Sequence, residues 1–147
     1  MRTQPDVAAL LDVNTLIALL DIDHRDHEAA HRWAEKHLSN GWATCATTQM
    51  GFLRVISQPG YPSPITVDEA GRLLRRATDH PSHEYWSSEP QPCASSVSLD
   101  VITGHRQITD AYLLALAVHQ NGCLVTFDRR ITTRHVPGAG QEHLVRL

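Results

Sequence analysis

Short apolar runs alternate with helical patterns along the chain, and two of these runs end at an aspartate. Residues 7–11 are apolar throughout and are followed by Asp12, and the largely apolar residues 123–127 are followed by Asp128. Runs of this length are typical of strands buried on both faces, as in a parallel sheet. Because strands and helices alternate through short connections, the sequence predicts a three-layer α/β/α sandwich with a mostly parallel central sheet.

The predicted elements follow one another closely. We expect strands at 7–11, 42–46, 83–86 and 123–127, with a further edge strand at 143–147. We expect helices at 16–20, about 27–38, from 47 or 48 through 56, 66 to about 79, and 111–119. The proposed N-caps are Asn14 or Thr15, Thr47 or Thr48, Thr66 in a capping box with Glu69, and Thr109. The proline-rich residues 59–64 and the serine- and proline-rich residues 87–98 are predicted to be loops.

Length and composition favour one soluble domain over residues 1–147. The chain has 147 residues, of which 41% are hydrophobic, which is enough to bury a core. Cys45, Cys93 and Cys123 show no C-x-x-C spacing, so neither a disulfide framework nor a cysteine zinc site is expected, and a reducing cytoplasm fits best. No apolar run approaches the roughly 20 residues that span a bilayer, and no signal peptide is expected.

The type and position of the charged residues are more informative than the net charge of the chain. The net charge of -3 does not indicate a strongly basic nucleic-acid binder. However, Lys36 is the only lysine among the 13 basic residues, and arginine suits bidentate contacts to phosphate. Acids outnumber basic residues within the first 31 positions, which is consistent with negative charge gathered for a metal ion.

Three aspartates are predicted to meet at one edge of the sheet. Asp12 and Asp128 follow strands, and Asp110 lies in the first turn of a helix, so all three belong at the carboxyl edge where α/β sheets bind ligands. Clustered carboxylates repel one another unless a cation neutralises part of their charge. Mg²⁺ and Mn²⁺ suit this role because they prefer oxygen ligands. A helix dipole would also account for Asp110, and a cap or turn for Asp128. Asp12 is harder to explain structurally, because an acid directly after an apolar strand needs a partner.

Three segments resemble the motifs of PIN-domain proteins in order and spacing. They are Leu-Leu-Asp-Val-Asn-Thr-Leu-Ile at 10–17, Ile-Thr-Asp-Ala-Tyr-Leu-Leu-Ala at 108–115 and Val-Thr-Phe-Asp at 125–128. Residues 51–59 and 104–106 are similar to segments of a VapC-like toxin subgroup. The resemblance therefore extends over nearly the whole chain.

This resemblance implies a Mg²⁺- or Mn²⁺-dependent endoribonuclease toxin of a toxin–antitoxin system, which hydrolyses phosphodiester bonds in structured RNA such as tRNA or rRNA. It also implies a homodimer silenced by a cognate VapB-like antitoxin. Carried over by position, Asp12, Asp110 and Asp128 are the metal-coordinating acids of the catalytic site. Asn14 orients Asp12 or a bound water, and Thr109 assists through its hydroxyl.

Gln49 departs from the family pattern. The family usually has a second acid, most often glutamate, at this place after the second strand. An amide oxygen can bind Mg²⁺ but brings no negative charge, so we expect weaker ion binding. Gln49 also supports an alternative function, namely a catalytically weakened PIN domain that binds RNA or antitoxin without efficient cleavage. A receiver-like domain with a phosphorylated aspartate is a third hypothesis, which the absence of lysine after Lys36 disfavours.

Histidines suggest two further candidate binding sites, one for zinc and one for a phosphate. His24, His27 and His31 have the spacing of one helix face and could bind zinc, although a solvated face is the simpler interpretation. His105 and Arg106 precede Asp110 closely and could contact a phosphate, or could belong to a surface loop.

Overall fold

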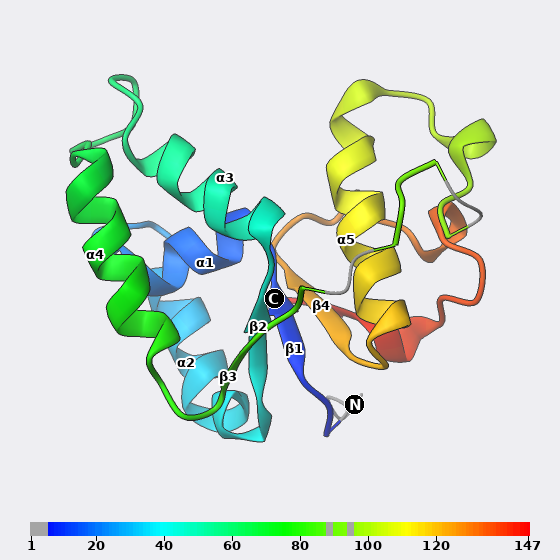
Figure 1. The fold of residues 1–147 in the computed structure, drawn as a ribbon, viewed down its shortest axis with the longest axis horizontal. Coiled ribbons are helices and arrows are strands. Elements are labelled where there is room, and N and C mark those ends of the chain that lie inside the picture. Colours follow the sequence, from blue (N-terminus) through cyan, green and yellow to red (C-terminus); the bar gives the residue numbers. More distant parts are fainter. Residues whose placement is uncertain (1–5, 88–89, 94–95) are drawn as a thin grey trace.

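A five-stranded sheet lies at the centre of the computed structural model, which describes residues 6–87, 90–93 and 96–147 (Figure 1). Its strands are β1 (Ala9–Leu11), β2 (Trp42–Thr44), β3 (His83–Tyr85), β4 (Cys123–Thr126) and β5 (Leu144–Arg146). They lie in the order β3-β2-β1-β4-β5, and every neighbouring pair is parallel. The predicted parallel sheet is confirmed, and so is its C-terminal edge strand.

Helices cover both faces of this sheet. The helices are α1 (Val13–Leu20), α2 (His27–His37), α3 (Ala46–Ile56), α4 (Val67–Thr78) and α5 (Ile108–His119). Figure 1 shows α1 to α4 on one side of the sheet and α5 on the other. Successive strand residues face opposite sides, so Leu10 packs in the core beneath α5, whereas Ala9 and Leu11 pack in the core beneath the other helices. The three-layer α/β/α architecture predicted from the sequence is confirmed.

The strand order creates a switch point between β1 and β4. From β1 the chain adds β2 and β3 on one side, and it then returns through α5 to place β4 on the other side of β1. In open α/β sheets, ligands bind at the carboxyl ends of the strands where the direction of winding changes. Asp12 directly follows β1, and Asp128 lies two residues after the end of β4, so both acids flank this switch point.

The first helix begins earlier than predicted. Its N-cap is Asp12 rather than Asn14 or Thr15, because the Asp12 side chain accepts a hydrogen bond from the backbone N of Thr15 at 2.8 Å. An aspartate at the N-cap also suits the positive end of the helix dipole. The capping residue of α1 is therefore one of the predicted site residues.

Two other N-caps also differ from prediction. Helix α3 has Cys45 as its N-cap, and the Thr48 hydroxyl accepts the Cys45 backbone N–H from within the first turn. Helix α5 has Gln107 as its N-cap instead of Thr109, because the 3-10 helix η3 (His105–Gln107) leads directly into it. The capping box of Thr66 and Glu69 is confirmed at the start of α4.

The turn after α5 brings the chain close to β1. Asn121 adopts a positive φ of 55°, and a Cβ at Gly122 would lie 2.5 Å from the Ala8 carbonyl oxygen. Glycine is therefore required there to let β4 begin beside β1. The predicted end of this helix at Asn121 and Gly122 is confirmed.

The two predicted loops contain no helix or strand in their described parts. Residues 59–64 are irregular as expected. Within the second predicted loop, at 87–98, residues 88–89 and 94–95 lie outside the described residues. Across the described ranges, every helix is too short or too polar to cross a membrane.

Candidate active site

Asp12 is the most deeply buried acid at the switch point. It is only 4% exposed, and its backbone N donates to the Val125 carbonyl at 3.2 Å, which ties the end of β1 to β4. Its Oδ1 accepts the Thr15 backbone N–H, and its Oδ2 accepts the Thr126 hydroxyl at 2.5 Å. Burial raises the pKa of Asp12 despite these hydrogen bonds, and the charge of Asp128 raises it further.

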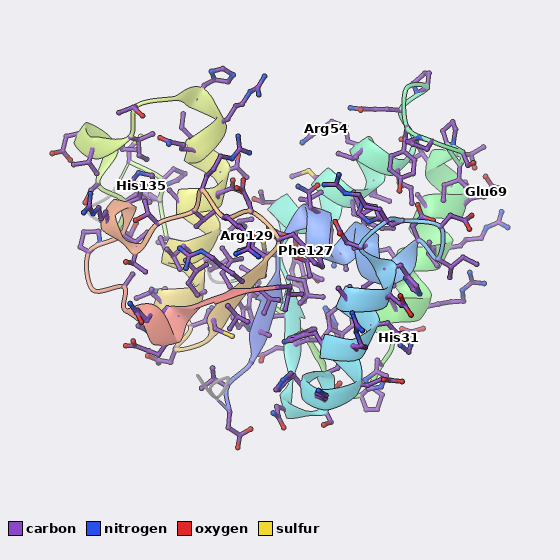
Figure 2. All side chains as sticks on the ribbon, turned by 180° about the vertical axis from the view of Figure 1, so that it is seen from behind. His31, Arg54, Glu69, Phe127, Arg129 and His135 are labelled. Atoms are coloured by element: carbon purple, nitrogen blue, oxygen red, sulfur yellow. The ribbon has the colours of Figure 1, made fainter. Side chains whose placement is uncertain are left out.

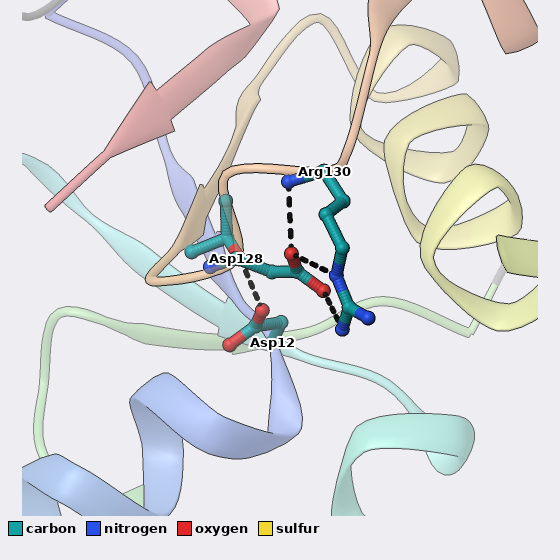
Figure 3. A network of polar contacts seen from close by, with 4 residues as sticks. Asp12, Asp128 and Arg130 are labelled. Carbon is teal, nitrogen blue, oxygen red and sulfur yellow. Dashed lines mark hydrogen bonds and ion pairs between the residues drawn. The ribbon is translucent and has the colours of Figure 1, made fainter. Parts of the chain in front are cut away.

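Thr126 links two of the predicted acids. While its hydroxyl donates to Asp12, its oxygen accepts the backbone N–H of Asp128 at 2.9 Å. One threonine at the end of β4 therefore positions the Asp12 carboxylate and the backbone of Asp128 together (Figure 3). Thr126 was not predicted from the sequence, although a polar residue in an otherwise apolar strand, two positions before an aspartate, is a usable signal.

Asp128 is paired with Arg130. The Arg130 guanidinium donates to both carboxylate oxygens, with Nε to Oδ1 and Nη2 to Oδ2 each at 3.0 Å. The Arg130 backbone N donates to Oδ1 at 2.8 Å. These bonds favour the ionised form and lower the pKa of Asp128. Arg130 was likewise not predicted as a partner of this acid.

Asp110 completes the acidic group. It lies in the first turn of α5, as predicted, and is partly buried. Burial raises the pKa of Asp110 to about 6, and the charges of Asp12 and Asp128 contribute to the rise while Arg130 opposes it. This coupling means that the structure brings the three predicted acids into one electrostatic group.

The three acids fit a hard divalent ion that is held partly through water. Among the described residues, no three His, Cys, Asp or Glu side chains form a metal site by themselves. However, the Asp110 carboxylate makes no hydrogen bond with any described residue, and two neighbouring acids destabilise its charged form. Mg²⁺ commonly keeps several waters and uses only one or two carboxylates. The donor set therefore suits Mg²⁺ or Mn²⁺.

The other predicted site residues lie apart from these contacts. Asn14 is exposed and does not hydrogen-bond to Asp12, so its predicted orienting of that carboxylate is not seen, and its contact to a bound water stays a prediction. Thr109 is exposed in the first turn of α5. Gln49 lies in the first turns of α3, where its Nε2 donates to the Thr44 hydroxyl at 2.9 Å.

The histidine candidates divide into two groups. His24 and His27 hydrogen-bond to nearby backbone atoms, and His31 faces Glu35 at 3.6 Å. Within the described ranges these histidines do not form a metal-binding group, and of the three only His31 lies on an exposed surface, while His24 and His27 are partly buried. His105 and Arg106 are exposed on η3 and line a pocket of about 210 Å³ beside Asp110 and Asp128.

Comparisons with known proteins identify the family of the chain. Residues 9–136 match the PIN domain family model. Ribonuclease VapC44 of Mycobacterium tuberculosis (strain ATCC 25618 / H37Rv) is 55% identical over 141 residues, covering 95% of this chain and 99% of the relative. Ribonuclease VapC39 of the same strain is 40% identical over 124 residues, covering 83% of this chain and 89% of the relative.

Two solved structures have the same fold at low sequence identity. VapBC2 from Rickettsia felis, bound to a DNA fragment from its promoter, matches with a TM-score of 0.59 and 12% identity over 95% of this chain and 97% of that one. PAE2754 from Pyrobaculum aerophilum matches with a TM-score of 0.60 and 17% identity over 95% of this chain and 84% of that one. The family match and the high identity to the mycobacterial relatives place the chain in the VapC group of the PIN-domain family.

Proposed function

We propose that this protein is the endoribonuclease toxin of a toxin–antitoxin system, and that it hydrolyses RNA with the help of Mg²⁺ or Mn²⁺. The observation that carries the proposal is the coupled group of Asp12, Asp110 and Asp128 at the switch point of the sheet. The names of the mycobacterial VapC ribonucleases support the activity. The absence of a membrane-spanning helix in the described residues is consistent with a cytoplasmic enzyme.

Asp12, Asp110 and Asp128 would hold the ion. When bound, such an ion polarises a phosphoryl oxygen and lowers the pKa of a coordinated water. The protein contributes a fixed arrangement of acids, since Thr126 and Thr15 hold both oxygens of Asp12 in place. Without an ion, burial and the two neighbouring acids raise the pKa of the Asp110 carboxyl to about 6, and a bound cation would relieve this repulsion.

Basic residues beside the acids would bind the RNA backbone. Arg106 and Arg130 are exposed and line the same pocket as Asp110 and Asp128. Guanidinium groups bind phosphate oxygens in a planar fork, so these two arginines can bind the phosphates on either side of the cut. Few aromatic residues occur in the chain, so we expect shape and phosphate contacts to dominate recognition of a structured RNA such as tRNA or rRNA.

A cleavage assay tests the activity. The purified protein is incubated with total RNA and Mn²⁺, beside the Asp12→Asn and Asp110→Asn variants and a sample with a chelator. Discrete cleavage that is lost in both variants and with the chelator supports the proposal. Equal cleavage by all three proteins would reveal a contaminating nuclease and remove this support.

Gln49 favours a second candidate, a PIN domain that binds RNA or antitoxin without efficient cleavage. Its amide nitrogen is held by Thr44, and no acid occupies its place. RNA binding by the wild-type protein without cleavage in the same assay would select this alternative.

We further propose a VapB-like antitoxin as partner and a homodimer as the assembly. The VapBC2 structure from Rickettsia felis supports this choice of partner, because its name pairs a VapB component with a VapC component, and a chain of that structure has the fold of this protein. Size-exclusion chromatography with light scattering tests the dimer. Loss of RNA cleavage after addition of the protein encoded beside this gene tests the antitoxin.

A further inference from the structure

The pocket beside the acids extends beyond the groups that the cleavage chemistry uses. It has a volume of about 210 Å³ and is lined by residues of α5 and of the segment after β4. Besides Asp110 and Asp128, its walls include Ala111, Ile131 and His135. The acids therefore open directly onto a cavity that is also lined by basic and apolar side chains, among them Arg106 and Arg130.

His135 is a largely buried residue of this wall. It is 7% exposed, and no hydrogen bond joins its imidazole to any described residue. Figure 2 shows it on the α5 side of the sheet. The ring nitrogens of His135 are not among the fully enclosed polar atoms of the described residues, so they are accessible from the cavity that His135 lines, and a ligand there can hydrogen-bond to them.

The backbone around His135 is fixed even though its ring is not. His135 ends the 3-10 helix η4 (Thr133–His135), whose N-cap Thr132 accepts the Arg134 backbone N–H through its hydroxyl at 3.3 Å. The His135 carbonyl accepts the Ser98 backbone N–H at 2.8 Å. The position of the His135 backbone is therefore set before any ligand arrives, as expected for a recognition group.

The other walls define the chemistry of the ligand. Ala111 and Ile131 are buried and offer apolar surface. The pocket carries charges of both signs, because Arg106 and Arg130 line it together with Asp110 and Asp128. The volume lies below the roughly 300 Å³ at which pockets for drug-sized ligands begin, so it suits a single ring system. Arg106 lines the pocket and is exposed, so it is accessible to a phosphate outside the pocket. The apolar surface suits a flat ring, the imidazole suits its polar edge, and the arginines suit flanking phosphates, so the lining fits a nucleobase within RNA.

We propose that this pocket holds one nucleobase next to the phosphate that is cut, and that His135 reads the edge of that base. The proposal rests on the proposed ribonuclease function. An imidazole presents a donor on one nitrogen and an acceptor on the other, so bases with different edges pair with it unequally. His135 is then a residue that determines substrate specificity.

Binding of four short homopolymeric oligoribonucleotides, one for each base, tests the specificity. Fluorescence anisotropy is measured with Ca²⁺ in place of Mg²⁺, and a gel verifies that the RNA stays intact. We expect one oligonucleotide to bind about tenfold more tightly than the others, a preference that His135→Ala reduces to about twofold. The matched variant Arg106→Gln removes a phosphate contact, so it should weaken all four alike and keep their ranking.

Two further measurements keep the test decisive if His135→Ala is poorly folded. His135→Phe keeps a flat ring but removes both nitrogens, and it should lose the preference in the same way. In the wild-type protein, the NMR signal of the His135 ring should shift and saturate with the preferred RNA. The signal of His119, which is exposed at the end of α5, should stay unchanged.

The proposal is overturned if the His135 signal does not move at saturating RNA, or if the His135 variants keep the ranking. It is also overturned if the wild-type protein binds none of the four oligonucleotides. The separate assay on total RNA then decides the ribonuclease function by itself, because cleavage there without any effect of His135 would reject only the base pocket.

Discussion

Arg130 forms a bidentate ion pair with Asp128, one of the three acids of the candidate site. Two guanidinium nitrogens lie 3.0 Å from the two carboxylate oxygens, and the Arg130 side chain is 75% exposed whereas that of Asp128 is 18% exposed (Figure 3). An exposed arginine can leave such a pair at small cost. We therefore expect that a divalent cation bound to Asp128 would displace Arg130 from this ion pair.

Arg130→Gln should strengthen the binding of Mn²⁺. The substitution removes a positive charge that competes for Asp128, so we expect the dissociation constant to fall by about three- to tenfold. Isothermal titration calorimetry measures this constant, and Arg129→Gln is the matched control because Arg129 is exposed and adjacent (Figure 2). Unchanged or weaker Mn²⁺ binding by Arg130→Gln alone would contradict the role of Arg130 as a competitor.

Asp110→Asn should stabilise the protein at neutral and higher pH. The fold raises the pKa of Asp110 from 3.8 to about 6, so the wild-type protein loses stability as the pH rises through that range and the carboxyl ionises. The variant escapes this loss and should gain at most about 3 kcal/mol in free energy of unfolding above about pH 7. Urea denaturation at several pH values measures the gain, which should vanish below about pH 4. A gain that does not depend on pH would rule out this explanation.

Thr126→Val should destabilise the protein and disturb both acids that Thr126 contacts. The buried Asp12 loses the hydroxyl that lowers its pKa, and the Asp128 backbone N–H loses its acceptor. We expect a loss of about 2–3 kcal/mol in the free energy of unfolding. Thr126→Ser keeps the hydroxyl and should cost only about 1 kcal/mol, as judged by the same denaturation experiment. Equal losses in the two variants would show that the hydroxyl contributes little.

Much of the fold followed from the sequence because its signals are local. Apolar runs and turn residues located the strands, and the rule for carboxyl edges placed Asp12 and Asp128 together. The N-caps were less predictable, since several polar residues stand near each helix start and only the backbone geometry selects one. Asp12 is the N-cap of α1 because the end of β1 fixes it beside the Thr15 backbone N.

The contacts of the site were beyond prediction because they join distant parts of the chain. Thr126 and Asp12 are 114 positions apart, and nothing in either segment specifies which hydroxyl meets which carboxylate. The unpartnered ring of His135 depends on how η4 packs, which no periodicity reports. Gln49 was located correctly on the helix after β2, yet its hydrogen bond to Thr44 required the structure.

Gln49→Glu should raise the affinity for Mn²⁺. A carboxylate in this place adds negative charge near the carboxyl end of β2, and the Thr44 hydroxyl can turn to donate to it. Calorimetry should give a dissociation constant about tenfold lower, whereas Gln58→Glu, an exposed position beyond α3, should change nothing. Unchanged or weaker binding by Gln49→Glu would show that this residue does not serve the ion.

The central claim is that three distant aspartates hold one cation together. Mn²⁺ binding followed by electron paramagnetic resonance tests this most directly, on the wild-type protein and on Asp12→Asn, Asp110→Asn and Asp128→Asn, with the exposed Asp23→Asn as control. Each of the three site variants should weaken binding by about tenfold or more, and the control should match the wild type. Wild-type affinity in all three site variants would contradict the account.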